Sequence, residues 1–184
     1  MPDLIVPLRR EDRLRTPWKN GAGTTEEVAV DGGAHPGWRI SIADLGDTPS
    51  IFSTFPGLDR IFTIVGPHGV DLELAGTTSH VAPLRPFTFD GEVDLRCVPA
   101  GSTSAFNVMV DRNSYRAAVT IHDLRDTALH TDPDTVTVAY VHSGRIDAEG
   151  HTAHSGDCLL VRRSAVEMVG IGTITRVEIT ALRS

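Results

Sequence analysis

Three cations stand in short segments otherwise rich in small and apolar residues: Lys19, Arg39 and Arg60. A guanidinium binds a carboxylate through paired, charge-assisted hydrogen bonds, and an ammonium acts as a compact point charge. A small dicarboxylate needs two such anchors, and its remaining polar end needs a carboxamide or a hydroxyl. We therefore expect at least one of these cations to contact a small acidic metabolite.

The two arginines also have a structural interpretation, in which each forms an internal salt bridge. The carboxylates that could accept them are Asp44, Asp59 and Glu26. For either arginine taken alone, the residue pattern does not decide between the two roles.

Further pocket residues follow from the same segments. Residues 17–25 are too polar for a core strand, and their glycines would weaken a helix, so we expect a loop there. The candidate polar groups are Asn20, Thr24, Ser41 and Asn107. The candidate apolar walls are Trp18, Phe55, Phe62 and Phe106. Small-molecule pockets generally set a few polar groups in such an apolar lining.

Metal and nucleophile chemistry have weaker support. The chain has no His-x-His pair, and His151 and His154 would point to opposite faces of a strand. Cys97 and Cys158 lack a His at a readable spacing, so we expect buried free thiols. We therefore predict no metal, no cofactor and no catalytic residue.

The composition limits the partners. The chain has 184 residues and a formal net charge of −7, which argues against binding to nucleic acid. No run approaches the ~20 apolar residues of a membrane-spanning helix, and the N-terminal apolar stretch is too short for a signal peptide. We expect a cytoplasmic protein that binds neither nucleic acid nor membrane.

Short strand-like segments separated by breakers extend along the whole chain, and no segment shows a helical stripe of any length. Residues 40–47 are echoed by residues 119–126 at a constant offset of 79. This pattern predicts an all-β protein made of two packed barrel units. We place them at residues 1–110 and 111–184.

Two resemblances accompany this pattern. The second half resembles a cupin, with a hairpin at residues 142–145 and a Gly156-Asp157 turn. Four spaced blocks resemble the HutD/Ves family: residues 18–26, 38–43, 52–60 and 106–109. Ala22 stands where that family commonly has a third glycine. The resemblance implies a bicupin fold, two packed cupin-type β-barrel or jelly-roll units in one compact body.

The resemblance also implies an association with histidine utilisation, through N-formylglutamate or a related small dicarboxylate. We therefore expect a sensor or regulator with its pocket in the N-terminal unit, which contains all four blocks. One alternative is a metal-independent cupin enzyme acting on the same ligand, with Glu26 or a pocket His as acid or base. Another is a structural or interaction protein, in which the blocks serve folding or a homodimer interface.

Overall fold

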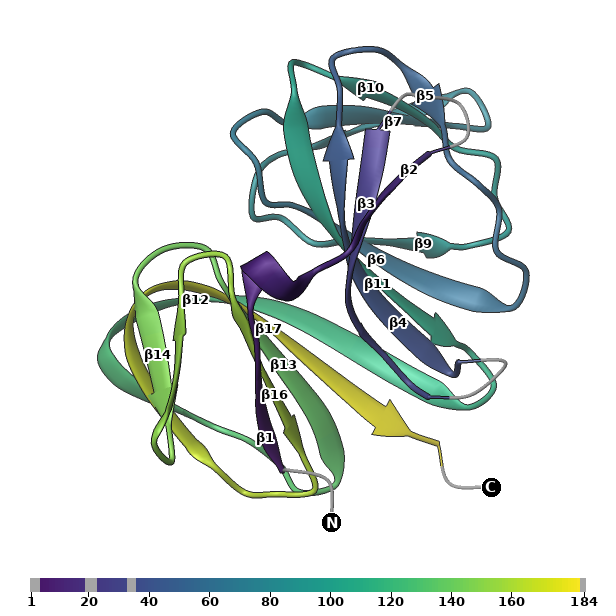
Figure 1. The fold of residues 1–184 in the computed structure, drawn as a ribbon. Helices are drawn as coiled ribbons and strands as arrows, with labels where there is room; N and C mark the ends of the chain where they lie inside the picture. The colour runs from purple at the N-terminus through teal and green to yellow at the C-terminus, as the bar shows by residue number, and fades with distance from the viewer. Residues whose placement is uncertain (1–3, 19–22, 33–35, 183–184) are drawn as a thin grey trace. The chain divides into compact units, whose positions relative to one another are not determined.

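The computed structural model describes residues 4–18, 23–32 and 36–182 (Figure 1). Within these ranges the regular elements are β-strands, apart from one 3₁₀ turn, η1 (Arg10–Asp12). The all-β class is therefore confirmed. No helix among the described residues has the length and apolar character needed to cross a membrane.

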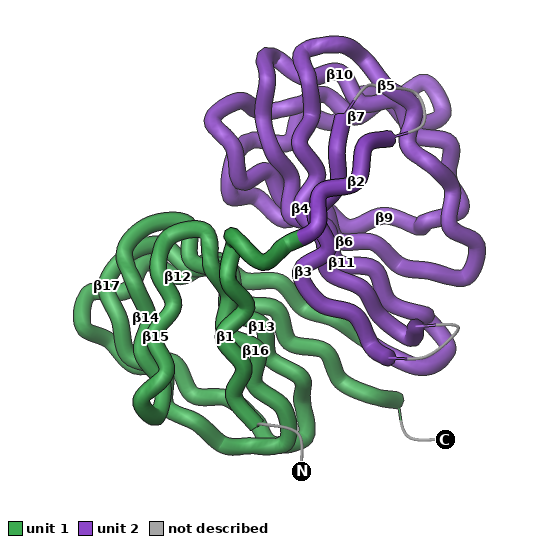
Figure 2. The backbone as a smooth tube through the Cα atoms, viewed as in Figure 1, with its two compact units in different colours: residues 1–13, 116–184 green, residues 14–115 purple. Residues whose placement is uncertain are grey.

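The chain divides into two compact units (Figure 2): unit 1 holds residues 1–13 and 116–184, and unit 2 holds residues 14–115. Unit 2 contains two antiparallel sheets. The larger has the strand order β2-β3-β4-β11-β6-β9, and the smaller has the order β5-β10-β7-β8. Their bounds are β2 (Arg15–Pro17), β3 (Gly23–Val30), β4 (Trp38–Leu45), β5 (Ser50–Ile51), β6 (Leu58–Ile64), β7 (Val70–Leu74), β8 (Thr77–Val81), β9 (Phe87–Asp90), β10 (Arg96–Pro99) and β11 (Thr103–Asp111).

The core of unit 2 lies between its two sheets. Ala43, Phe62 and Ala105 from the larger sheet pack in one cluster with Leu72 and Cys97 from the smaller. Alternate residues of a strand point to one face, so each sheet contributes every second side chain to this cluster. The same alternation sets which residues face the cavity described below.

Unit 1 contains one sheet of the order β1-β16-β13-β17-β14-β15, with β12 also paired to β17. Its strands are β1 (Ile5–Leu8), β12 (Tyr115–His130), β13 (Thr135–Val141), β14 (Arg145–Ala148), β15 (His151–His154), β16 (Cys158–Arg162) and β17 (Glu167–Ala181). One apolar cluster takes residues from all seven of these strands, including Ile5, Leu124 and Ile174. The sheet therefore curls around its own core as a barrel.

Strand β17 allows this curling because it pairs with two strands in succession along its length. Its first part pairs with β14 around Gly170, and its second part pairs with β13 from Ile174 to Thr180. Gly172 lies between them with φ +120°, and a Cβ there would stand 1.9 Å from the Ser143 carbonyl oxygen. A side chain at this crossing would therefore push the strands apart.

The unit boundaries differ from those expected at residues 1–110 and 111–184. Residues 1–13 belong with the C-terminal part because β1 pairs with β16, with Ile5 opposite Val161. The Arg10 backbone N–H also donates to the Asp157 carboxylate at 2.9 Å. Such a pairing, about 150 residues apart in sequence, leaves no local signal in the pattern.

The internal echo corresponds to equivalent places in the two units. Residues 40–47 begin within β4, and residues 119–126 lie within β12. Strand β11 runs between β4 and β6, and β17 runs between β12 and β13. In each unit, the echoed segment thus lies in the strand beside this central strand: β4 beside β11, and β12 beside β17.

Both cysteines, Cys97 and Cys158, are free and buried, as predicted. Burial raises the pKa of the Cys97 thiol and of the Cys158 thiol to about 12 each. Neither thiol forms the thiolate needed for nucleophilic chemistry near neutral pH.

Candidate functional site

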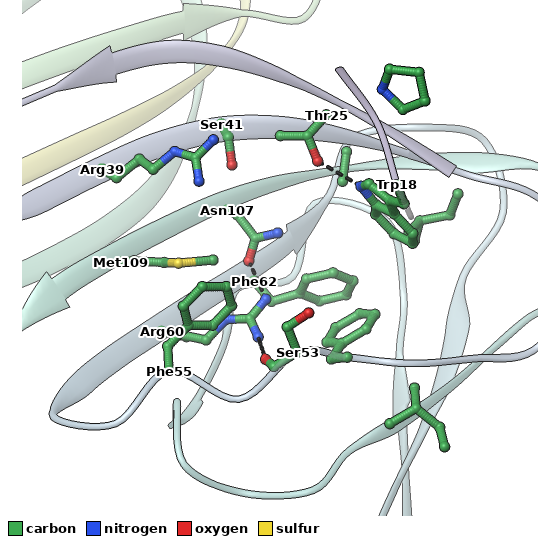
Figure 3. A pocket seen from close by; sticks show the side chains of 15 residues that line it. Trp18, Thr25, Arg39, Ser41, Ser53, Phe55, Arg60, Phe62, Asn107 and Met109 are labelled. Carbon is green, nitrogen blue, oxygen red and sulfur yellow. Dashed lines mark hydrogen bonds between the residues drawn. The ribbon is translucent and has the colours of Figure 1, made fainter. Parts of the chain in front are cut away.

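A cavity of about 540 Å³ opens on the larger sheet of unit 2 (Figure 3). Seven of the eleven candidate pocket residues line it: Trp18, Arg39, Ser41, Phe55, Arg60, Phe62 and Asn107. The remaining lining residues are Pro17, Thr25, Ala43, Leu45, Ile51, Phe52, Ser53 and Met109. The volume falls within the usual range of small-molecule sites.

Strand register brings the polar residues together. On adjacent strands β4 and β11, Ser41 lies directly opposite Asn107. Met109, two residues further along β11, lies opposite Arg39 on one side and Arg60 on the other. Residues separated by two share a face, so these five side chains project into one cavity.

Arg60 is the most unusual group of the site. It is only 4 % exposed, and it donates to the Asn107 Oδ1 at 3.1 Å and to the Ser53 carbonyl oxygen at 3.4 Å. Its Nε has no hydrogen-bond partner within the described part of the chain. No described carboxylate forms a salt bridge with it, and Asp59 pairs with Arg112 instead.

Three aromatic rings surround the Arg60 guanidinium. Its central carbon lies 5.2, 5.4 and 4.8 Å from the ring centroids of Phe52, Phe55 and Phe89. Cation–π attraction offsets part of the lost hydration, yet burial still lowers the pKa of Arg60 to about 10. A shift of this size corresponds to about 3 kcal/mol spent on keeping the group charged at neutral pH. An anion in the cavity would recover part of that free energy.

Arg39 lies at the exposed rim of the same cavity. Its Nε donates to the Glu27 Oε2 at 3.0 Å, and the two side chains are 39 % and 48 % exposed. The salt-bridge interpretation therefore holds for Arg39, although its partner is Glu27 rather than Asp44, Asp59 or Glu26. Figure 3 shows its guanidinium beside Ser41, within the lining.

Trp18 forms one wall of the cavity and is fixed by two hydrogen bonds. Its indole Nε1 donates to the Thr25 Oγ1 at 2.7 Å, and its backbone N–H donates to the Gly23 carbonyl oxygen at 2.9 Å. A Cβ at Gly23 would stand 3.1 Å from the Trp18 ring and 2.4 Å from the Asp44 carbonyl oxygen. Gly23 therefore allows the ring to pack against β3 and β4.

Other predicted residues lie elsewhere. Thr24 does not line the cavity, and its hydroxyl lies 3.5 Å from an Asp44 carboxylate oxygen. Phe106 is buried but is absent from the lining, because its neighbours Asn107 and Ala105 take the inner face of β11. Lys19 and Asn20 lie outside the described residues.

Glu26, the proposed acid or base, also lies away from the cavity. Its carboxylate accepts two hydrogen bonds from Arg15, at 3.1 and 2.8 Å, and it follows the cavity-lining Thr25 in β3. Successive residues of a strand point to opposite faces, which separates the two side chains.

Several lining residues were missed by the sequence pattern. Thr25 and Met109 belong to the quoted blocks, and alternation through strands containing Ser41 and Asn107 would have indicated Met109. Phe52 and Ser53 come from the segment before β6, where no strand period applies. Their place depends on how that segment folds over Arg60.

Within the described ranges, no group of three or more His, Cys, Asp or Glu is arranged to hold a metal ion. Those ranges contribute no His to the cavity lining either. Metal independence remains a prediction for elemental analysis to test.

The fold is that of a cupin-type barrel protein, and unit 2 contains a cavity of about 540 Å³. A family model described as HutD matches residues 10–175, and the chain belongs to that family. An uncharacterised 21.2 kDa protein in the hutC 3′ region of Pseudomonas putida is 40 % identical over 115 residues, 60 % of each chain. Protein Ves of Escherichia fergusonii is 37 % identical over 111 residues, 58 % of each. The matched region thus spans about 60 % of the length of these curated relatives.

Solved structures agree on the fold. HutD from Pseudomonas fluorescens SBW25 superposes with a TM-score of 0.87 at 29 % identity, covering 97 % of this chain and 100 % of that one. A cupin 2 conserved barrel domain protein from Leptotrichia buccalis has a TM-score of 0.58 at 10 % identity, covering 86 % and 88 %. The second likeness concerns the fold alone. The predicted HutD/Ves resemblance and the cupin-type fold are both confirmed.

Proposed function

We propose that this HutD-family protein reversibly binds a small acidic metabolite of histidine breakdown, N-formylglutamate or a related dicarboxylate, in the cavity of unit 2. It releases the ligand unchanged and acts as a sensor or regulator of histidine utilisation. The pathway assignment rests on the family and on the hut-region relative.

The observation that carries the proposal is the buried Arg60 guanidinium at the cavity wall. A buried charge is costly unless it is paired, and the described chain offers it only the neutral oxygens of Asn107 and Ser53. A carboxylate entering the cavity would complete this hydrogen-bonding set. The free energy needed to bury the Arg60 charge is already part of the folding free energy, so an anion that binds there does not have to supply it.

Neighbouring groups support an elongated polar ligand. Because Asn107 uses its Oδ1 to accept from Arg60, its amide nitrogen is left to donate, and Figure 3 shows that nitrogen turned away from the guanidinium. Ser41, opposite Asn107, adds a hydroxyl. Arg39 lies further out at the rim and supplies a second cation for a second carboxylate. The aromatic wall residues Trp18 and Phe55 would exclude water.

The lining favours binding over catalysis. Its described ionisable residues are the two arginines Arg39 and Arg60, with no His, Cys, Asp or Glu among them. Arginine stays protonated near neutral pH and does not serve as a general acid or base there. Such a site can hold and orient an anion without transferring a proton.

Calorimetric titration with N-formylglutamate, glutamate, urocanate and histidine, followed by product analysis, tests the proposal. We expect N-formylglutamate to bind and to be recovered intact. Arg60→Met should weaken binding about 10- to 100-fold, since a charge-assisted hydrogen bond is worth ~1.5–3 kcal/mol. Because the variant also removes a buried charge, its melting temperature should be unchanged or higher. Turnover of the ligand would support the enzyme alternative instead.

Asn107→Asp provides a second variant that keeps the shape of the site. The new carboxylate would stand where Oδ1 lies now, 3.1 Å from the Arg60 Nη2, and would neutralise it. We expect a higher melting temperature and loss of anion binding. Arg96→Met, which removes a cation paired with Glu73 on the smaller sheet, is the matched control and should bind normally. Equal binding by all three variants would refute the site.

A further inference from the structure

The two cavity arginines differ in how their charges are balanced. Arg60, at the buried end, has no carboxylate partner among the described residues, whereas Arg39, at the rim, is paired with Glu27 at 3.0 Å. Among the described residues, the cavity therefore presents one uncompensated cation inside and one compensated cation at the rim. The second carboxylate of a dicarboxylate must compete with Glu27 for Arg39, whereas a ligand with one carboxylate can bind at Arg60 alone.

Strand geometry places Glu27 on the cavity face of the sheet. Glu27 lies opposite Ser41, and the register between β3 and β4 shifts immediately afterwards, between Glu27 and Ala29. Before this irregularity, Thr25 and Glu27 share a face, and Thr25 lines the cavity. Glu27 thus reaches Arg39 diagonally across the two strands, from just beyond the lining.

The spacing of the two arginines suits a ligand that spans both. Arg39 and Arg60 lie on the strands that flank β11, each opposite Met109. Two strand separations place their backbones about 10 Å apart, and both long side chains enter the same cavity. Their guanidinium groups can therefore approach the two ends of one small dicarboxylate.

We propose that Glu27 is a specificity-determining residue, which competes with the outer carboxylate of a bound dicarboxylate for Arg39 and so limits its preference over a monocarboxylate. This inference rests on the proposed function, because it assumes that an anion binds at Arg60. Exchange of partners at Arg39 is inexpensive, since an ion pair with both side chains more than one-third exposed is weak and water-accessible. Arg39 can thus leave Glu27 for the ligand without a large loss.

Glutarate and its monoamide, glutaramate, are suitable probes because they match in length and shape and differ in one carboxylate. Glutarate is symmetric, so a single monoamide covers both orientations. The quantity measured is the ratio of the two dissociation constants by calorimetry. Glu27→Gln should raise the preference for glutarate about two- to fivefold, the range that an exposed ion pair supports.

Glu73→Gln is the matched control. Glu73 pairs with Arg96 at 2.8 Å across two strands of the smaller sheet, and these side chains are 42 % and 47 % exposed. The variant removes the same charge from a similar pair in the same unit, away from the cavity. It should leave the ratio of dissociation constants unchanged.

An Arg39→Met background separates competition from long-range repulsion. If Glu27 acts through Arg39, Glu27→Gln has no effect on the ratio in that background, and repulsion alone would preserve the effect. An unchanged ratio in the Glu27→Gln single variant, or an equal rise in Glu73→Gln, overturns the inference while Arg60-dependent binding still stands. If neither probe binds in an Arg60-dependent way, the proposed function and this inference both fall.

Discussion

At the scale of single residues, the chain carries ionisable groups in surroundings that oppose their charge. The Arg60 guanidinium lies among three aromatic rings, and burial lowers its pKa. We propose that a bound anion offsets the free energy that this burial costs. His142 in unit 1 shows the opposite outcome, because burial lowers the pKa of its imidazole to about 4 and keeps it neutral. Its Nε2 lies 2.5 Å from the Thr175 Oγ1, and the Tyr140 ring meets it edge-on at 4.8 Å.

The His142 shift predicts a pH dependence of stability. The unfolded chain protonates this imidazole near pH 6.5, whereas the folded chain does so only near pH 4. The unfolded state therefore binds more protons between these values, and the free energy of unfolding falls as the pH drops from 6.5 to 4. We expect a loss of about 2–3 kcal/mol, measured by urea denaturation at several pH values.

His142→Gln should remove this part of the pH dependence, because the glutamine does not titrate. His154→Gln, at an exposed position of β15, is the control and should retain it. Parallel pH profiles for His142→Gln and the unmodified protein would show that another group is responsible.

At the scale of elements, the segment between β5 and β6 decides how Arg60 is covered. It carries Phe52, Ser53 and Phe55, all of which line the cavity. Its backbone is held from outside the cavity: the Phe55 N–H donates to the Gly91 carbonyl oxygen at 2.6 Å, and the Gly57 N–H donates to Glu92 at 2.8 Å.

Arg112 links this segment to β9 and β11. Its backbone N–H donates to the Gly57 carbonyl oxygen at 3.1 Å, and its Nη2 donates to the Leu58 carbonyl oxygen at 2.9 Å. Its Nη1 also donates to the Asp90 Oδ2 at 2.9 Å, and its Nε lies 3.2 Å from the Asp59 Oδ1. Hydrogen bonding to Arg112 lowers the pKa of Asp90. Arg112 is therefore a positioning residue for the cavity.

Arg112 does not line the cavity. Arg112→Met should nevertheless loosen residues 52–57 and weaken anion binding roughly three- to tenfold, or ~0.7–1.4 kcal/mol. Hydrogen exchange of the amides in residues 53–58 should become faster, a readout that a purely local charge effect would not change. Arg96→Met serves again as the control. Unchanged exchange together with weaker binding would contradict the positioning role.

At the scale of the whole molecule, the two units differ in how the chain builds them. Unit 2 is continuous, from residue 14 to residue 115, and contains the cavity. Unit 1 takes its edge strand β1 from the N-terminal end, and Ile5 of that strand is buried in its core. Stability of unit 1 therefore depends on a segment far in sequence from the rest of the barrel.

Ile5→Ala should lower the free energy of unfolding by about 2–4 kcal/mol, because it leaves a cavity in the unit 1 core. Anion affinity at 25 °C should stay unchanged, since the site lies in unit 2. Leu14→Ala removes an 82 % exposed leucine and is the control, with little expected effect. Equal destabilisation by the two variants would show that β1 is not part of the core.

The residue pattern predicted the strand-rich class and the family, and it named seven of the residues that line the cavity. The charges of Arg39 and Arg60 in segments rich in small and apolar residues marked both as candidates for a role in binding. The four blocks identified the family because they are four separate matches spaced between residues 18 and 109. These features depend on residues close together in the sequence, so the sequence alone is enough to predict them.

Which of these segments meet in space depends on the folded chain. The register of β4, β11 and β6 set Arg39 and Arg60 on either side of Met109. The register of β3 against β4 shifts just after Glu27, which lies on the cavity face and reaches Arg39. The pairing of β1 with β16 makes residues 1–13 part of unit 1. Register and long-range pairing depend on contacts between residues far apart in sequence, where a slip of one position turns every side chain to the opposite face.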